Sequence, residues 1–389
     1  MAENENGNMF RAAFRRFRSD PLAVTGGIGI VLLLVLALAA PLLANSKPFY
    51  LRLPDGGVSF PFVRFIFAPE SPEFLIEQIF NYILLAAIWF GFLRLLPGIS
   101  RKLRYRLLLG GAILILIPFA TVPRKLDRTD YHELAARPGV QAVFAPIPYG
   151  PFETVARAYQ APSPQHLCGT DDIGRDVAVR MLYGARVSLA VGLGATMIVL
   201  LIGTLVGLIT GYFRGWFDLL SMRLVEIIMC FPTFLLLLIL MSILGDRKFE
   251  QSILIVIAVI GLTGWIGVTF LVRGETLKQS ALPYIQSCRV AGIPVWRILL
   301  IHLLPNIAGP ILISFTFGVA GAILAESGLS FLGFGVKPPT ASWGGLLRQA
   351  SDDPLSYWHL TLFPGLILFI TVCSFNFTGE GLRRALSPK

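Results

Sequence analysis

The sequence predicts an all-α membrane protein, a polytopic bundle of about eight spanning helices. Apolar residues make up 55% of the 389-residue chain, charged residues make up only 14%, and the mean hydropathy is +0.71. Soluble domains carry about 25% charged residues, so the composition places this chain in a membrane. Several apolar runs approach or exceed the ~20 residues that cross the hydrocarbon core. The runs are continuous and lack period-2 alternation, which favours helices over a transmembrane barrel.

Basic residues cluster at the ends of these runs and set the expected orientation. The clusters are Arg11, Arg15, Arg16 and Arg18; Arg101, Lys102, Arg104 and Arg106; and Arg383, Arg384 and Lys389. Lys and Arg are enriched in cytoplasmic loops, so we expect both termini in the cytoplasm. The same pattern accounts for the net charge of +10. Because no aromatic residues interleave with basic ones on a polar domain, we expect no nucleic-acid partner.

The first apolar run, 22–44, follows a cytoplasmic basic arm, 1–21. A cleaved signal peptide is the alternative, because Ala37-Leu38-Ala39 resembles a cleavage site. The run is longer than the usual signal-peptide core, which favours an uncleaved helix. Residues 45–74 are rich in Pro and Gly and should lie outside.

Two weaker runs follow, 79–96 and 107–122. Either one alone could be an interfacial or re-entrant segment, since the first contains Asn81 and the second contains Pro118. Together they flank the basic sequence SRKLRYR, which would be cytoplasmic if both runs crossed. We therefore prefer a hairpin of two spans, which makes 22–122 an N-terminal region with an extra helical hairpin.

The stretch 123–185 is polar and Pro-rich, and we expect it to form an extracytoplasmic segment. It contains Asp171, Asp172 and Asp176, whose spacing lacks the alternating oxygen ligands and final Glu of a calcium loop. A capped turn and a short interfacial helix are favoured, with Asp176 in an ion pair with Arg175 or Arg180. The four cysteines and four histidines form no metal-ligand spacing, so no metal is expected.

The remaining chain, 186–389, should form the core of the bundle. Its expected spans are 186–213, 224–244, 252–272, 307–332 and 360–382. The first of these carries Gly203, Gly207 and Gly211 at four-residue spacing. Glycines on one helix face allow a neighbouring backbone to approach closely, which predicts a tight helix pair here.

A polar break, 273–306, interrupts these apolar runs. Pro283 suits the first turn of a short helix over 284–290, and Gly292 suits a left-handed cap at its end. A second helix should begin near Val295 and end before Pro305, where the chain enters the membrane. The residues alone leave two interpretations open: a docking element for a partner, or an amphipathic linker that stabilises its own bundle.

This break resembles the Glu-Ala-Ala signature of permease subunits in ATP-driven importers. Gly292, Leu304 and Pro305 match that signature at the correct spacing, and Asn306 follows as in many peptide permeases. The Glu-Ala-Ala triplet itself is replaced by Gln286-Ser287-Cys288, and His302 stands where the signature has Ile. The resemblance therefore carries over the geometry of the turn but no ion pair made by the signature glutamate.

Two further stretches are similar to the dipeptide/oligopeptide/nickel branch of these permeases. They are CGTDDIGRDVAVRMLYGARVSL and ESGLSFLGFGVKPPTASWGGLL. The segments NSKPFYLRLPDGGVSFPF and APIPYGPF are similar to the Yej-type peptide permeases. The resemblance covers residues 165–389 together with the basic arm and the first helix.

The resemblance implies the fold of a type I ABC importer permease, with a six-helix core plus the extra hairpin. The chain would be one transmembrane subunit importing di- and oligopeptides across the bacterial cytoplasmic (inner) membrane. Its partners would be a second homologous permease, one or two ABC ATPase subunits, an extracytoplasmic substrate-binding protein and membrane lipid. No GxxxxGK[ST] motif occurs, so we expect no catalysis and no cofactor here, with ATP and Mg²⁺ used by the partner ATPase. The alternatives are a permease for nickel or another small solute, and an ion-coupled secondary transporter.

The importer interpretation predicts two sets of site residues. The expected ATPase-coupling residues are Tyr284, Gln286, Ser287, Cys288, Gly292, Leu304 and Pro305. Of these, Ser287 and Cys288 should fill a groove on the ATPase. Ionisable and polar groups inside a membrane are functional candidates, so we place Glu326, Asn306 and Glu226 on the substrate path.

Overall fold

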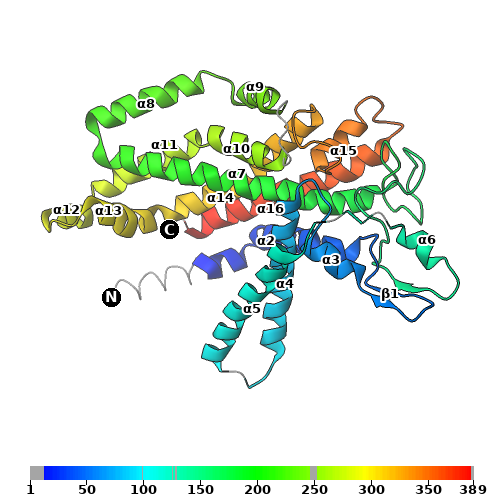
Figure 1. The fold of residues 1–389 in the computed structure, drawn as a ribbon. Helices are drawn as coiled ribbons and strands as arrows, with labels where there is room; N and C mark the ends of the chain where they lie inside the picture. The colour runs from blue at the N-terminus through cyan, green and yellow to red at the C-terminus, as the bar shows by residue number, and fades with distance from the viewer. Residues whose placement is uncertain (1–12, 99, 125, 128, 246–251, 387–389) are drawn as a thin grey trace. The chain divides into compact units, whose positions relative to one another are not determined.

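The computed structural model describes residues 13–98, 100–124, 126–127, 129–245 and 252–386 (Figure 1). The described part excludes residues 1–12 of the basic arm, which include Arg11, and residues 387–389, which include Lys389. The chain divides into two compact units. Unit 1 comprises Met1–Leu32, Leu189–Gly335 and Leu366–Lys389, and unit 2 comprises Leu33–Ser188 and Val336–Gly365.

Six helical stretches are long and apolar enough to cross a membrane. They are α2 (Pro21–Leu43), α4 (Phe74–Leu95), α5 (Arg101–Thr121), α7 (Val177–Phe213), the stretch Val295–Phe331 and α16 (Trp358–Leu386). Two bent pairs also pass the same test: α8 (Gly215–Met229) with α9 (Thr233–Gly245), and α10 (Ser252–Thr263) with α11 (Ile266–Ser280). With each pair counted as one span, the described residues hold up to eight candidate spans, which agrees with the predicted polytopic helical bundle.

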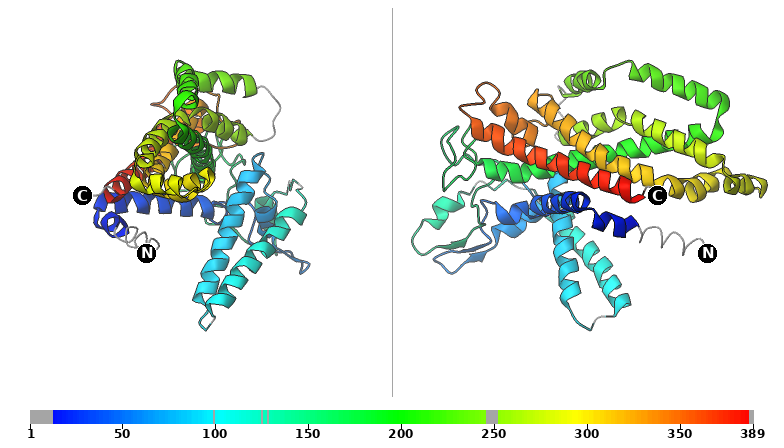
Figure 2. Two further views of the ribbon diagram at one scale, coloured as in Figure 1. Left: turned by 90° about the vertical axis from the view of Figure 1, so that its left-hand side faces the viewer. Right: turned by 180° about the vertical axis from the view of Figure 1, so that it is seen from behind.

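The predicted N-terminal hairpin is present as two helices. Helices α4 and α5 run side by side and are joined by a short turn (Figures 1 and 2). The indole Nε1 of Trp89 donates to the carbonyl of Leu107 at 3.1 Å. Gly111 has no side chain where the Trp89 indole lies, which allows the two helices this close approach. Both weak runs are therefore helices of spanning length, as the sequence indicated.

Two predicted spans are broken where the sequence analysis expected continuous helices. The run 224–244 divides between α8 and α9, which are bent by 76°. Pro232 lies at this break, and proline both lacks an N–H and disfavours helical geometry in the preceding residue. The run 252–272 divides between α10 and α11 with a bend of 42°, and α11 continues to Ser280. The helix therefore extends eight residues beyond the apolar run 252–272.

Unit 1 contains the tight helix pair that the glycine spacing predicted. A Cβ atom built on Gly207 would lie 2.8 Å from the carbonyl oxygen of Thr269, and one on Gly211 would lie 2.8 Å from that of Arg273. Gly203 faces the carbonyl of Trp265 in the same way. The glycine face of α7 thus packs against the backbone of α11, because any larger residue would occupy the space of that backbone.

Unit 2 contains a small sheet that the sequence analysis did not identify. Its order is β2-β1-β3, with both pairings antiparallel: β1 (Tyr50–Arg52), β2 (Val58–Ser59) and β3 (Gln141–Val143). Short helices lie between and after the strands: α3 (Pro61–Phe67), α6 (Tyr131–Ala135) and α15 (Trp343–Gln349). The strands are too short to give a periodic signal in the sequence.

Lys47 joins three separate segments of unit 2. Its ammonium group donates to the carbonyl of Asp127 at 2.8 Å and lies 3.5 Å from the Asp127 carboxylate and 3.7 Å from that of Glu70. The Tyr131 hydroxyl donates to the same Asp127 carboxylate at 2.6 Å. Partial burial would raise the pKa of Asp127, but the hydrogen bonds from Tyr131 and Thr129 and the charge of Lys47 lower it to about 2.

This lowered pKa predicts a loss of stability in acid. The folded-state pKa of Asp127 is about 2 and the ordinary value is 3.8, so its contribution to stability is present above this ordinary value. The contribution is lost as the pH falls from 3.8 towards about 2, because the unfolded chain then binds the proton more readily. In this pH window, we expect the thermal unfolding midpoint of Asp127→Asn to fall less steeply with falling pH than that of the wild type. An exposed control, Asp55→Asn, should keep the wild-type slope, and equal slopes in all three proteins would contradict the assignment.

Candidate functional site

The predicted polar break folds as a short helix that ends in a glycine turn. Helix α12 (Pro283–Val290) begins with Pro283 in its first turn, where its missing N–H costs little. Gly292 has a φ of +70°, as expected for a left-handed cap. The N–H of Ile293 donates to the carbonyl of Cys288, and that of Gly292 donates to the carbonyl of Arg289, both at 3.1 Å. These are the two hydrogen bonds of a Schellman motif, so the turn direction is fixed by the backbone itself.

The second helix begins at Val295, as predicted, but it does not end before Pro305. Helix α13 (Val295–Arg297) passes into a π-helical segment, η1 (Ile298–Leu303), and a 3₁₀ segment, η2 (Leu304–Ile307). Helix α14 (Ala308–Phe331) follows without a break. The N–H of Leu304 donates to the carbonyl of Leu299, and this wider turn accommodates Pro305 inside the helix. The stretch Val295–Phe331 is therefore one 37-residue helical unit.

One face of this segment is fixed to the rest of unit 1. A buried apolar cluster joins it to α7 and α11; its buried members are Leu208, Tyr212, Val272, Ile285, Ile298, Leu303 and Ile307. Ile285 and Leu303 are fully buried. Residues with no exposed surface cannot move independently of their neighbours in a close-packed interior. The helix–turn–helix is thus a rigid part of unit 1.

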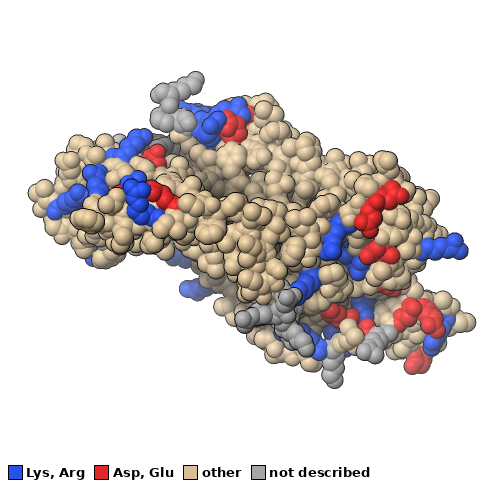
Figure 3. Space-filling model, turned by 90° about the horizontal axis from the view of Figure 1, so that it is seen from above, with Lys and Arg blue, Asp and Glu red and all other residues tan. Residues whose placement is uncertain are grey.

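The opposite face is exposed and carries apolar side chains. Val290 is 90% exposed and Trp296 is 56% exposed, although both flank the turn. The small Ser287 is exposed too, and its hydroxyl donates to the carbonyl of Pro283. Figure 3 shows mostly Lys and Arg among the charged side chains at the end of unit 1 that holds α12 and α13. The guanidinium of Arg289 lies 4.5 Å from the centre of the Tyr212 ring.

Cys288 lies differently from what the sequence suggested. It is half-buried and packs against the apolar cluster, as Tyr284 and Leu304 do. The expectation that Ser287 and Cys288 both face a partner groove therefore divides: Ser287 and Gln286 are exposed, and Cys288 contributes to the packing beneath them.

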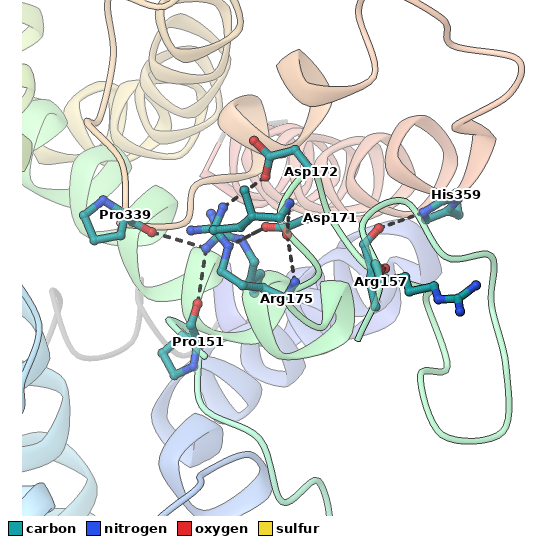
Figure 4. Close-up of polar contacts among 10 residues, drawn as sticks. Pro151, Arg157, Asp171, Asp172, Arg175, Pro339 and His359 are labelled. Carbon is teal, nitrogen blue, oxygen red and sulfur yellow. Dashed lines mark hydrogen bonds and ion pairs between the residues drawn. The ribbon is translucent and has the colours of Figure 1, made fainter. Parts of the chain in front are cut away.

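In unit 2, the aspartate-rich sequence forms a turn in which every carboxylate of the pattern has a partner (Figure 4). Asp171 is fully buried, 2.6 Å from Nε of Arg175 and 3.1 Å from Nε of Arg180. The prediction that Asp176 pairs with an arginine was wrong. Asp176 instead accepts from the N–H of Val179 at the start of α7 and lies 2.8 Å from Nδ1 of His166.

The turn geometry explains why Asp171, and not Asp176, pairs with the arginines. Gly174 has a φ of +87°, and its N–H donates to the carbonyl of Asp171, so the chain folds back on itself. Asp171 then points at the two arginines, and Asp176 is left at the cap position of α7. Within the described residues, no group of three or more His, Cys, Asp or Glu side chains could hold a metal ion.

The two stretches with family-like sequence meet in unit 2. The Arg180 guanidinium donates to the carbonyls of Pro151 and Pro339, both at 3.2 Å (Figure 4). The indole of Trp343 is fully buried and donates to the carbonyl of Met181 at 3.1 Å. Gly184 leaves room for this indole, since a Cβ there would lie 3.3 Å from it. Arg180, Gly184 and Trp343 thus connect the two stretches directly.

Comparison with known proteins tests these expectations. A family model described as the binding-protein-dependent transport system inner membrane component matches residues 203–389, and one described as the N-terminal TM domain of oligopeptide transport permease C matches residues 8–55. The chain is 37% identical over 233 residues to the glutathione transport system permease protein GsiD of Pectobacterium atrosepticum, covering 60% of this chain and 76% of that protein. It is 42% identical over 228 residues to GsiD of Escherichia coli O1:K1, covering 59% and 74%.

The chain belongs to the family of binding-protein-dependent transport permeases. It is a non-catalytic, multi-pass inner-membrane permease of an ABC importer in the oligopeptide family. A component of this kind works with an ATPase and a substrate-binding protein. The ion-coupled secondary transporter is thereby excluded.

The three residues expected on the substrate path lie on different elements of the permease, and each has its own partner there. Glu226 on α8 pairs with Arg223 at 2.5 Å, and both side chains are exposed. Asn306 in η2 donates to the carbonyl of His302 at 2.6 Å. Glu326 on α14 is fully buried and accepts from the Ser330 hydroxyl at 2.6 Å. The permease therefore holds them as separate groups in this conformation.

Sequence reasoning missed a large buried charged side chain, Arg186 on α7. It is 1% exposed, and its Nε donates to the carbonyl of Ala37 at 2.6 Å. That carbonyl has no intrahelical donor, because the residue four positions later is Pro41, which lacks an N–H. Two further bonds go to the carbonyl of Leu38 at 3.0 Å and to Oδ1 of Asn81 at 2.8 Å.

Arg186 thereby gives the extra hairpin a structural role. Asn81 on α4 accepts from Arg186 and donates to the carbonyl of Ile66 at 2.8 Å, so one side chain joins α4 to α7 and to α3. A signal was present in the sequence: an internal proline, an intramembrane asparagine and an arginine at the edge of a span. The three could be connected only once the helices were placed beside one another.

Proposed function

We propose that the permease translocates peptides, in the size range from dipeptides to oligopeptides. The support is the similarity to the two relatives reported above, which are glutathione transport system permease proteins, since glutathione is a tripeptide. Energy would come from ATP and Mg²⁺ in the separate ATPase, with no cofactor bound by this chain. A second homologous permease would complete the pathway, and Glu326, Asn306 and Glu226 would line it.

The coupling element of this proposal is the segment 273–306. A Schellman turn with exposed Val290 and Trp296, built on a fixed apolar cluster, offers a partner a rigid apolar tip. Because the helix runs without a break from Val295 to Phe331, a push on the tip would move α14 as well. Two-state tilting of a packed helix is a common route for such transmission.

The same proposal assigns sides of the membrane. The arm 1–21, the coupling segment and both termini would be cytoplasmic, and 123–185 would be extracytoplasmic. Residues 22–122 would form the N-terminal spans, and 186–389 the permease core. The support is the distribution of Lys and Arg, which are enriched in cytoplasmic loops.

Uptake by the reconstituted complex tests the substrate. Proteoliposomes containing both permeases and the ATPase, supplied with the binding protein, should accumulate labelled glutathione only when ATP is enclosed. Unlabelled dipeptides and oligopeptides should compete, and nickel ions should not. Accumulation of nickel without any accumulation of peptide would replace the peptide proposal by the nickel alternative.

Crosslinking tests the coupling element. In a variant whose four cysteines are replaced by serine, Val290→Cys should crosslink to the ATPase in the assembled complex. The matched control is Leu355→Cys, which is 89% exposed but lies in the loop before α16, where the proposal places the outside. ATPase crosslinks from Leu355→Cys, or none from Val290→Cys, would contradict the proposal.

A further inference from the structure

The turn between α4 and α5 carries a concentration of positive charge. Its cations, which we call the basic turn, are Arg94, Arg101, Lys102, Arg104 and Arg106. The sequence contains no Asp or Glu between residues 78 and 126, so the hairpin provides no counter-charge near them. None of the ion pairs between described residues involves a member of the basic turn.

The geometry of the turn leaves four of these cations exposed. Gly98 has a φ of +84° and closes the turn, and the Ser100 hydroxyl accepts from the N–H of Leu103 to cap α5. The Arg104 guanidinium turns back to the carbonyl of Leu96 at 3.3 Å. The other four cations are exposed, and one of them, Arg94, lies over the Phe90 ring on its own helix. The remaining exposed cations, Arg101, Lys102 and Arg106, lie in the first two turns of the 21-residue α5, whose N-terminal dipole adds to the positive potential.

The rest of α5 is apolar and has no buried residue among those described. Ile113 and Leu114 are 66% and 67% exposed, and Leu109, Leu116 and Ile117 are exposed as well. Tyr105 is exposed beside the basic turn, where an aromatic ring suits the boundary between headgroups and hydrocarbon. The hairpin thus presents cations at one end of a long apolar surface.

We propose that the basic turn and α5 bind an anionic phospholipid. Its phosphate would be held by Arg101, Lys102 and Arg106, and its acyl chains would lie along α5. A single anionic group joined to long apolar chains is the chemistry that this surface complements. A protein partner would need carboxylates confined to one end of an otherwise apolar helix. The proposal does not depend on the transported substrate or on the coupling segment.

Native mass spectrometry of the full-length permease in a neutral detergent tests the proposal. The probes are phosphatidylglycerol, which is anionic, and phosphatidylcholine, which is zwitterionic, with matched acyl chains. We expect retention of phosphatidylglycerol over phosphatidylcholine by the wild type. Each basic residue near an anionic membrane surface contributes about fivefold to binding. The triple variant Arg101→Gln/Lys102→Gln/Arg106→Gln should therefore reduce this preference by at least tenfold.

A second triple variant controls for the loss of net charge. Arg52→Gln/Arg137→Gln/Arg157→Gln removes the same three charges from exposed positions of unit 2 and should keep the wild-type preference. Equal retention of the two lipids by the wild type, or full retention by the first variant, would overturn the proposal. So would displacement of the lipid by inorganic phosphate at equal concentration, which would show that any anion suffices. A photo-crosslinker placed at Leu114 that captures a protein of the assembled complex instead of lipid would also overturn it.

Discussion

Arg186→Met should destabilise the permease by about 3–5 kcal/mol, the range found when one partner is removed from a buried ionic or hydrogen-bonded group. The loss leaves the carbonyls of Ala37 and Leu38 and the amide oxygen of Asn81 without this donor. An unsatisfied buried polar group costs about 1–3 kcal/mol. The measurement is the unfolding midpoint in detergent, with Arg223→Met as control, since Arg223 is an exposed arginine in a surface ion pair.

A double-mutant cycle separates this explanation from a general packing defect. Pro41→Ala restores an N–H that can donate to the Ala37 carbonyl within α2. The double variant Pro41→Ala/Arg186→Met should therefore lose less stability than the sum of the two single losses. Strict additivity would show that Arg186 does not act through that carbonyl. Arg186→Lys should fall between wild type and Arg186→Met, because one ammonium cannot reproduce the guanidinium's geometry.

Gly292→Pro should separate ATP hydrolysis from uptake while the permease still inserts into the membrane. Proline cannot adopt the φ of +70° found at residue 292, and it lacks the N–H that donates to Arg289. The Schellman turn would open and the exposed tip would lose its fixed direction. We expect the uptake rate to fall at least tenfold, with ATPase activity of the reconstituted complex largely retained.

The space around Gly292 supplies a matched control. A Cβ at this position would meet no atom within 4 Å, so any effect of a side chain must act through the backbone conformation. Gly292→Asn should keep most uptake, because asparagine tolerates the left-handed region, and Gly292→Val should lose it. If valine and asparagine behaved alike, or if Gly292→Pro transported at the normal rate, the turn would not carry the coupling.

Much of the fold could be predicted from the sequence because membrane insertion depends on local composition. Apolar run length predicted the helices of spanning length, including the two weak ones at α4 and α5. It could not locate the break at Pro232 or the continuity through Pro305. Pro232 and Pro305 lie in similar apolar surroundings, but the helix breaks at the first and continues through the second. At Pro305 the π-helical turn supplied alternative hydrogen bonds, and at Pro232 the chain bent.

The candidate site likewise has features that the sequence could predict and features that it could not. Gly292 and the start at Val295 were predictable, since a left-handed cap and a helix start are properties of a few neighbouring residues. The orientation of Cys288 was not, because it depends on the cluster formed with α7 and α11. The arginine partner predicted for Asp176 is paired with Asp171 instead for a comparable reason: the turn at Gly174 decides which carboxylate faces the arginines.

The sequence by itself determined the membrane class, the helices of spanning length, the family and the glycine turn of the segment 273–306. Each of these is encoded in composition or in residues near one another along the chain. Only the tertiary structure decided that Arg186 satisfies a carbonyl freed by Pro41 and joins α2, α4 and α7. The residues of that contact are up to 149 positions apart. A hydrogen bond forms between atoms that are close in space, and sequence spacing alone does not specify that distance.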